Sequence, residues 1–298
     1  MKLTVFTPLF NRAHLLSRIY ESLCKQTYKD FEWVIVDDGS SDNSKDVIDY
    51  IKKSKEDFPI HYFFQENGGK YRAINHGVKE AKGELFLILD SDDSLPEDSL
   101  ETIFQYYEQI KDDKSFGGVA GYMAHHDGNL IGQCPTNEVV DATSSDYRYK
   151  YGATGDMCEV FRTDVLREFP FPEIPDEKFC PEMLILYRIA RKYKLRWFHK
   201  VIYFRDYLDD GLTDRIVQIR MKSPILTMMS YAEKMGLDIP WKQKLKCAIN
   251  YFRFSLCLTK EHEKKVLKEN IHIPKISSKW LFCYPLGWLL SQKDKMRQ

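Results

Sequence analysis

Three aspartates lie together in Asp90-Ser91-Asp92-Asp93, directly after the mostly apolar run 84–89. A run of that length, bounded by Gly83 and an acidic cluster, predicts a strand buried on both faces that ends where the carboxylates begin. The carboxylates would therefore lie at the C-terminal end of this strand. In an open α/β sheet, ligands bind at the edge formed by the C-terminal ends of the strands, and closely spaced carboxylates there suit a divalent cation that also bridges phosphates. Because Asp, Ser and the nearby Pro96 also form turns, the stretch taken alone is equally consistent with a plain turn.

Three further polar clusters each follow a predicted strand. If these strands are parallel, all four clusters lie on one edge of the sheet. A nucleotide diphosphate needs acceptors for its base and ribose, and donors and a cation for its phosphates, so the joint occurrence favours a nucleotide site. The three clusters are Thr7-Pro8-Leu9-Phe10-Asn11-Arg12, Asp37-Asp38-Gly39-Ser40 and Asn67-Gly68-Gly69-Lys70.

Strands and amphipathic helices alternate through the first 125 residues. Such alternation specifies an α/β fold with a mainly parallel, Rossmann-like sheet and helices on both faces. The predicted strands are 3–7, 31–36, 60–64, 84–89 and 117–123, and the predicted helices contain 15–23, 47–51, 73–81 and 100–107.

The composition is that of a globular protein with one large domain, or one domain and an appendage. The chain has 298 residues, of which 43% are hydrophobic and 30% charged. Its seven cysteines are scattered and form no C-x-x-C pair, which is typical of reduced packing residues in a cytoplasmic protein. We expect no secretory leader and no membrane-spanning segment, since no run of about 18 apolar residues occurs.

The zero net charge hides an asymmetry between the body and the C-terminal tail. Residues 222–298 contain 15 Lys and Arg against 6 Asp and Glu, a net charge of +9, which leaves −9 for residues 1–221. An acidic body argues against a nucleic-acid partner, and a basic tail fits an approach to an anionic surface. We expect a body at 1–214 and a helical, basic and aromatic extension at 215–298.

Several segments resemble the family 2 glycosyltransferases in motif, order and spacing. The resemblance is strong over about 1–125, the expected donor half, and weaker over 150–205 in an acceptor half of about 126–214. It implies a GT-A fold, a nucleotide-sugar donor, Mn or Mg, and inversion at the anomeric carbon. The matching segments are 4–12, 26–28, 31–42, 67–69, 73–77 and Asp90-Ser91-Asp92-Asp93.

The resemblance also implies roles for individual residues. Asp38 would accept a hydrogen bond from the uracil of a UDP-sugar, with Pro8 and Phe10 lining the base pocket, and a carboxylate pairs well with an imide N–H. Asp90 would meet ribose or sugar hydroxyls and Asp92 would hold the cation, while Asp93 would only cap the segment after it. Lys70 and Arg72 either assist at phosphate or are solvated charges at a helix start. The other expected donor-binding residues are Thr7, Arg12, Gly69, Asn75 and Ser91.

An inverting displacement needs a base to take the proton of the acceptor hydroxyl. In the corresponding segment, many family members carry a Glu-Asp pair followed by a helix. This chain has Pro181-Glu182 there, so Glu182 takes the place of the Asp. The helix dipole also favours an acid at this position without any catalytic role. Asp156 is the reserve base or an acceptor-binding residue, and Glu159 is a second reserve.

Four other features draw a plainer interpretation. His125-His126-Asp127 predicts a loop, because neighbouring strand residues point to opposite faces and rarely share one metal ion. His199 is expected at a strand end, and Asp209–Asp214 as a turn with a helix cap at Thr213. The aromatic run 280–290, between Lys279 and Lys293, fits equally an interfacial membrane segment or a helix packed on the body or a second subunit.

The sequence thus predicts a metal-dependent, inverting, nonprocessive glycosyltransferase of cell-surface polysaccharide (capsule) assembly. It would move one sugar from a nucleotide-sugar to a glycan or lipid-linked acceptor, in the cytoplasm or at the inner face of the membrane. Single-sugar transfer is expected because the Gln-x-x-Arg-Trp motif of processive members is absent. The alternatives are a sugar nucleotidyltransferase, which usually has a Gly-rich loop after its first strand, and a noncatalytic glycan-binding or scaffolding protein.

Overall fold

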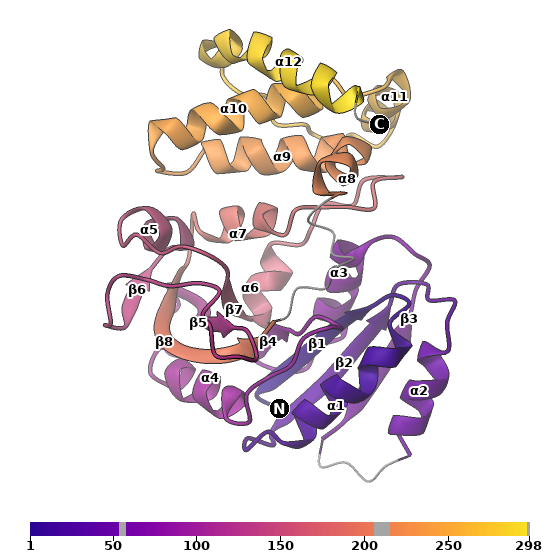
Figure 1. Cartoon of the computed structure of the whole chain (residues 1–298), viewed down its shortest axis with the longest axis vertical. Coiled ribbons are helices and arrows are strands. Elements are labelled where there is room, and N and C mark those ends of the chain that lie inside the picture. The colour runs from indigo at the N-terminus through magenta and orange to yellow at the C-terminus, as the bar shows by residue number, and fades with distance from the viewer. Residues whose placement is uncertain (54–57, 206–214, 297–298) are drawn as a thin grey trace. The chain divides into compact units, whose positions relative to one another are not determined.

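The computed structural model describes residues 1–53, 58–205 and 215–296, which cluster into two compact units (Figure 1). The sheet unit comprises Met1–Pro170 and Lys192–Tyr207, and the helical unit comprises Phe171–Arg191 and Leu208–Gln298. The predicted division at 214 stays a prediction, and residues 171–191, which it placed in the body, cluster with the C-terminal helices. The expected turn at 209–214 and the cap at Thr213 lie outside the described residues.

The described part of the sheet unit contains one eight-stranded sheet in the order β3-β2-β1-β4-β7-β5-β8-β6. Neighbours among β1 to β4 are parallel, as are β5 and β8, whereas β7 runs antiparallel to β4 and β5, and β6 antiparallel to β8. The mainly parallel α/β sheet is therefore confirmed, with two reversed strands that the alternation pattern did not reveal. The strands are β1 (Leu3–Leu9), β2 (Phe31–Asp37), β3 (Ile60–Phe64), β4 (Leu85–Ile88), β5 (Phe116–Ala124), β6 (Val140–Ala142), β7 (Met157–Arg162) and β8 (Lys194–Phe204).

Helices connect the strands and cover both faces of the sheet. The four predicted helices are confirmed as α1 to α4, and two short helices flank β7. The bounds are α1 (Leu16–Cys24), α2 (Ser44–Ile51), α3 (Lys70–Glu80), α4 (Ser99–Glu108), α5 (Ser144–Tyr149) and α6 (Thr163–Glu168), with a 3-10 turn at Ala13–Leu15.

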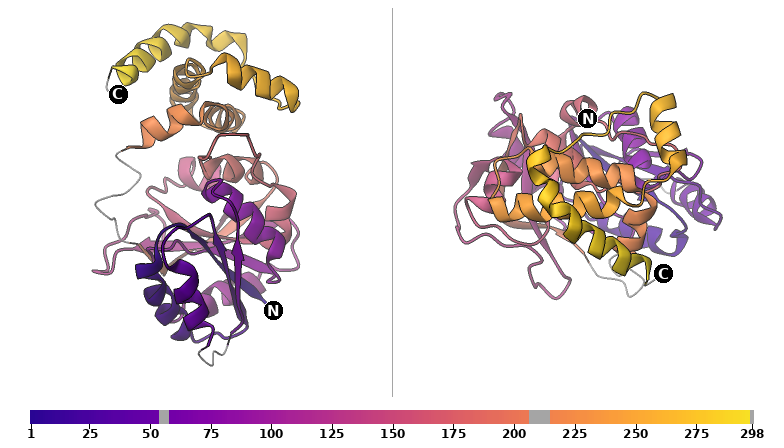
Figure 2. Two further views of the ribbon diagram at one scale, coloured as in Figure 1. Left: turned by 90° about the vertical axis from the view of Figure 1, so that its right-hand side faces the viewer. Right: turned by 90° about the horizontal axis from the view of Figure 1, so that it is seen from above.

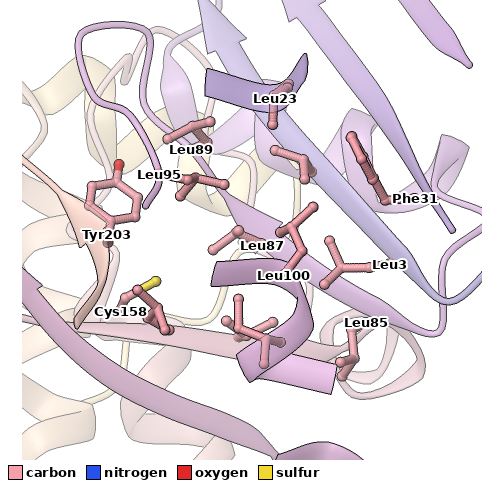
Figure 3. Close-up of a cluster of buried hydrophobic side chains, with 14 of the residues drawn as sticks. Leu3, Leu23, Phe31, Leu85, Leu87, Leu89, Leu95, Leu100, Cys158 and Tyr203 are labelled. Carbon is pink, nitrogen blue, oxygen red and sulfur yellow. The ribbon is translucent and has the colours of Figure 1, made fainter. Parts of the chain in front are cut away.

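One face of the sheet carries the main hydrophobic core, against α1, α2 and α4. Figure 3 shows Leu23 of α1 and Leu100 of α4 beside the strand residues Leu3, Leu85 and Leu87. All five are fully buried, and burial of each side chain contributes about 2 kcal/mol. Alternate residues of β1, β2 and β4 supply this face because strand side chains alternate between faces.

The opposite face is covered by α3, which approaches the sheet closely. Phe6 and Phe86 stack there with ring centroids 5.1 Å apart. A Cβ atom at Gly77 of α3 would lie 2.2 Å from the Phe6 ring, so only glycine permits this approach. The fit fixes α3 on β1 and thereby places Lys70, its first residue, and Gly69, which precedes it, beside the strand ends.

The helical unit is built around α10, which packs against both α9 and α12 (Figures 1 and 2). Its core includes Phe252, Phe254 and Trp280. Glu233 of α9 pairs with Arg188 at 2.9 Å and Arg191 at 2.5 Å, which fastens α7 to α9. The described helices include none long and apolar enough to cross a membrane. They are α7 (Met183–Ile189), α8 (Ile216–Lys222), α9 (Pro224–Met235), α10 (Trp241–Ser255), α11 (Lys260–Lys268) and α12 (Tyr284–Lys295), with a 3-10 helix η3 (Ser278–Cys283) before α12.

Candidate active site in the sheet unit

The four polar clusters meet at one edge of the sheet, as predicted. Leu9 at the end of β1 lies opposite Asp37 at the end of β2, which in turn lies opposite Phe64 at the end of β3. Phe6 pairs with Ile88, the last residue of β4. Because β7 is reversed, it begins at this same edge, directly after Asp156. We call this the carboxyl edge of the sheet.

The loops after β1 and β2 are tied together by short polar side chains. Asn11, with φ 51°, accepts hydrogen bonds at Oδ1 from the backbone N–H of Ser41 at 2.8 Å and of Asp42 at 3.3 Å. Its own N–H donates to Ser40 Oγ at 2.9 Å. Asn is among the few residues that adopt this left-handed conformation readily. The two loops therefore form a single rigid wall at the carboxyl edge.

Asp38 organises the loop that leads into α3. Its Oδ1 accepts from Gln65 Nε2 and Gly68 N, both at 2.8 Å, and its Oδ2 from Gly69 N at 2.7 Å and Asn67 Nδ2 at 3.1 Å. A carboxylate has about four acceptor sites, so the loop uses them all. The expected contact between Asp38 and uracil stays a prediction, and it requires the base to replace one of these bonds.

Lys70 and Asp90 form an ion pair in the middle of the edge. The ammonium nitrogen lies 2.6 Å from Asp90 Oδ1 and 2.9 Å from Oδ2. The two side chains are 36% and 30% exposed, so the pair is open to solvent on one side. Lys70 is thus held at the site, whereas Arg72 donates from Nε to the Tyr71 hydroxyl at 2.9 Å.

A buried tyrosine supports the acidic cluster from β8. The Tyr203 hydroxyl accepts from the N–H of Asp90 at 3.0 Å and donates to Asp93 Oδ2 at 2.6 Å. Burial raises the pKa of Asp93 to about 7 against the hydrogen bond from Tyr203, and the charges of Asp90 and Asp92 act in the same direction as burial. The expected capping role of Asp93 is wrong, because α4 begins only at Ser99 and the Asp93 side chain is 2% exposed.

Asp92 has the surroundings expected of a cation ligand. It is half-buried, and burial followed by the charge of Asp90 raises its pKa, while Lys70 and Arg12 lower it. A divalent cation would offset the crowding of negative charge. No group of three or more His, Cys, Asp and Glu residues in the described part of the chain is arranged to hold a metal. A single carboxylate such as that of Asp92 suits a cation like Mg²⁺, which usually takes most of its ligands from phosphate oxygens and water.

The two candidate bases lie in different units. Asp156 pairs with Arg205, which follows β8, at 3.1 Å, and both residues belong to the carboxyl edge of the sheet unit. Glu182 belongs to the helical unit, directly before α7, and its side chain is exposed. Glu159 lies within β7 and pairs with Ala120 in the sheet. The choice of base stays a prediction.

The remaining donor-binding candidates differ in how far they reach solvent. Thr7 is fully buried, and its Oγ1 accepts from Trp33 Nε1 at 3.0 Å, so its side chain belongs to the core and not to an open pocket. Phe10 is 48% exposed beside the β1 end, as a base-stacking residue should be. Pro8, Arg12, Asn75 and Ser91 are half-buried, and Gly69, with φ 98°, precedes α3.

His126 and His199, two histidines considered as possible metal ligands, contact neighbouring side chains of the sheet unit. His126 lies in the predicted loop, and its Nε2 is 3.2 Å from Ser94 Oγ. The placement of His199 at a strand end is wrong, because it lies within β8, stacked on Tyr122 at 5.1 Å and 3.4 Å from the Tyr147 hydroxyl. Sequence reasoning missed Tyr203, whose only signal was a tyrosine inside the apolar run of β8.

Comparisons with known proteins agree with this geometry. Residues 4–162, more than half of the chain, match the family model "Glycosyl transferase family 2". Glycosyltransferase GlyG of Streptococcus pneumoniae is 31% identical over 162 residues, which are 51% of this chain and 53% of that protein. The GalNAc(5)-diNAcBac-PP-undecaprenol beta-1,3-glucosyltransferase of Campylobacter jejuni is 29% identical over 218 residues, 71% of this chain and 67% of that protein.

A solved structure shows the same fold. S. aureus TarS 1-349, in complex with UDP-GlcNAc, superposes with a TM-score of 0.62 at 18% identity, covering 96% of this chain and 79% of that one. This likeness concerns the fold alone, and the chain spans about half the length of GlyG. The match to the family model covers most of the sheet unit, including all four polar clusters. The chain belongs to glycosyl transferase family 2 and has its GT-A fold.

Proposed function

We propose that the protein is an inverting, metal-dependent glycosyltransferase that moves one sugar from a UDP-sugar to a glycan or lipid-linked acceptor. The observation that carries the proposal is the cluster of Lys70, Asp90 and Asp92 at the carboxyl edge. The TarS structure contains UDP-GlcNAc, and the Campylobacter relative is named for an undecaprenol-linked acceptor. Both support a role in the synthesis of polysaccharide or lipid-linked glycan. We extend the proposal to cell-surface polysaccharide, such as capsule, made on the cytoplasmic side of the membrane.

The start of α3 is suited to the donor diphosphate. Helix N-termini attract anions through their free N–H groups and dipole, and α3 is 11 residues long. Lys70 adds a positive charge at its first position, and Arg12 acts electrostatically on Asp92 at the same edge. We assign the diphosphate to this position, with Asp90 contacting ribose or sugar hydroxyls and Phe10 beside the base.

Mn²⁺ or Mg²⁺ held by Asp92 would neutralise the negative charge that develops on the leaving diphosphate. The protein's own groups do the rest. Lys70 orients the Asp90 carboxylate through their ion pair, and the Tyr203 hydroxyl fixes the backbone of Asp90 by accepting a hydrogen bond from its N–H. The loop closed by Asp38 keeps Gly69 and Lys70 in place.

Transfer proceeds by a single displacement. The acceptor hydroxyl oxygen attacks the anomeric carbon opposite the leaving group, the bond from that carbon to the diphosphate oxygen breaks, and a carboxylate takes the hydroxyl proton. We assign the base to Glu182, and acceptor hydroxyl binding to Asp156. Asp156 is held in place by its ion pair with Arg205 at 3.1 Å, and a carboxylate fixed in this way suits hydrogen bonding to acceptor hydroxyls.

The test is a transfer assay with labelled UDP-sugars, chosen by thermal shift because donor binding stabilises the folded state by mass action. We expect Asp92→Ala to lower kcat/KM by about 100-fold or more, and EDTA to abolish transfer until Mn²⁺ or Mg²⁺ is restored. Asp112→Ala, an exposed acid elsewhere in the sheet unit, is the matched control and should retain full activity. Glu182→Gln should lower kcat with donor affinity unchanged, and Asp156→Asn should mainly raise KM for the acceptor.

Full transfer by Asp92→Ala would refute the metal role, and a fully active Glu182→Gln variant would remove the base. Release of pyrophosphate from UTP and a sugar phosphate would identify a nucleotidyltransferase. Binding of UDP-sugars without transfer to any acceptor would favour a noncatalytic glycan-binding protein. The anomeric configuration of the product, read by NMR, decides between inversion and retention.

A further inference from the structure

We propose that the helical unit binds the surface of an anionic membrane through one face of η3 and α12. This outer face consists of large apolar side chains with exposed fractions between 43% and 60%. The described residues contain sixteen exposed large hydrophobic side chains, and six of them fall within positions 281–289. Contiguous exposed apolar surface of this kind marks an interaction site. The six residues are Leu281, Phe282, Tyr284, Leu286, Trp288 and Leu289.

The packing of α12 forces these side chains outward. The helix buries Gly287, Ser291 and Asp294, together with Cys283 just before it. A Cβ atom at Gly287 would lie 2.8 Å from the backbone oxygen of Ile249, so α12 approaches the backbone of α10 through its smallest residue.

An ion pair fixes the rotation of α12 about its axis. Arg253 of α10 donates from Nε and Nη2 to both oxygens of Asp294, at 2.5 and 2.7 Å. Asp294 is 9% exposed, so this pair lies inside the helix contact. A surface helix in water normally turns its apolar side to the core, and α12 does the reverse. The exposure is therefore built into the fold and is not the result of a loosely attached helix end.

The apolar surface continues onto the start of α10. Trp241 is 60% exposed, and its ring lies 6.1 Å from that of Trp280. Trp280 in turn lies 6.0 Å from Phe282 of the outer face. Trp and Tyr are the residues that favour the boundary between lipid and water, because each has an apolar ring and a polar atom.

The charge of the region favours anionic lipid over a second copy of this chain. Residues 222–298 carry 15 Lys and Arg against 6 Asp and Glu. Lys279, Lys293 and Lys295, which flank the outer face, are all exposed. Two copies joined through this face would bring like charges together, whereas an anionic bilayer attracts them.

The length of α12 sets the geometry of binding. Twelve residues make a helix of about 18 Å, too short to cross the hydrocarbon core. We therefore infer that α12 lies in the plane of the membrane, with its outer face among the headgroups and upper acyl chains and its lysines at the phosphates.

The test is vesicle flotation of the full chain, without sugar donor or acceptor, so that the result is independent of the proposed transfer. We expect binding to phosphatidylcholine vesicles containing about 30% phosphatidylglycerol, weak binding to phosphatidylcholine alone, and release by salt. The double variant Phe282→Ser/Trp288→Ser should bind about tenfold or more weakly. Tyr50→Ser/Tyr151→Ser, which removes two exposed aromatics of the sheet unit, is the matched control and should bind like the unchanged protein.

Sedimentation velocity on the same proteins identifies the other occupant. A dimer that Phe282→Ser/Trp288→Ser converts to monomer, together with no flotation of the unchanged protein, would overturn the proposal and assign the face to a second copy. Equal binding to neutral and anionic vesicles would overturn the role of charge. Unfolding midpoints in urea establish that both double variants are folded.

Discussion

Helices α1 of the sheet unit and α12 of the helical unit bury opposite kinds of residue. α1 turns Leu16, Ile19 and Leu23 to the core and leaves Ser17 and Glu21 exposed. In α12 the small and polar residues are inside and the large apolar ones outside. Apolar burial holds α1, whereas close backbone approach and an ion pair hold α12. The difference separates a helix that serves the fold from one whose free face is available to another surface.

Substitution of matched leucines tests this contrast most strongly. Leu23→Ala removes a fully buried side chain and should lower the free energy of unfolding of the sheet unit by about 3 kcal/mol. Leu286 is 53% exposed and buries little apolar surface. Leu286→Ala should therefore change the free energy of unfolding of the helical unit by less than about 0.5 kcal/mol. Urea denaturation followed separately in each unit measures both values. Similar losses in the two variants would mean that α12 buries Leu286 in solution.

Substitutions on the face of α12 that packs against α10 should destabilise the helical unit, whereas substitutions on its outer face should not. Gly287→Val places a branched side chain against the backbone of Ile249 and Arg253 and should destabilise the helical unit by about 2 kcal/mol. Lys293→Val, on the exposed side of the same helix, controls for the helix propensity of valine. Denaturation midpoints of the two variants give the comparison, and equal midpoints would show that α12 and α10 are not in close backbone contact in solution.

Much of the sheet unit could be predicted because its signals are local. Buried strands such as 31–36 are mostly apolar runs, and the polar clusters follow them directly in the chain. Parallel pairing then brings these clusters together whatever the details of the helices. The order of the strands is another matter, since nothing local shows that β7 inserts antiparallel between β4 and β5.

Contacts between residues far apart in the sequence could not be predicted from local sequence patterns. Tyr203 and Asp93 are 110 positions apart, and the pair exists only because β8 passes under the acidic cluster. The four bonds of Asp38 depend on the path of a loop about 30 residues later. Likewise, the run 280–290 shows that α12 is rich in aromatics, but only the position of Gly287 against α10 shows which face is free.

Each unit also contains a buried carboxyl group, and Glu177 of the helical unit allows a test by pH. Its Oε1 and Oε2 accept from the N–H groups of Ile225 and Leu226, at 2.7 and 2.8 Å, at the start of α9. Burial raises the pKa of Glu177 to about 7, against the opposing effect of these two hydrogen bonds. Between the unfolded value near 4.3 and pH 7, the unfolded chain has lost this proton while the folded protein keeps it.

Stability of the helical unit should therefore fall as pH rises through this window. From pH 6 to pH 7 the contribution of Glu177 is a loss of about 1 kcal/mol. The glutamine of Glu177→Gln cannot titrate, so the free energy of unfolding of this variant should fall by about 1 kcal/mol less than that of the unchanged protein between pH 6 and pH 7. The loss of one hydrogen-bond acceptor lowers the stability of the variant equally at both pH values. Glu263→Gln on α11, where the side chain is exposed, should follow the unchanged protein. Parallel pH profiles for the unchanged protein and Glu177→Gln would mean that the carboxylate is already charged at pH 6, with the helix N-terminus outweighing burial.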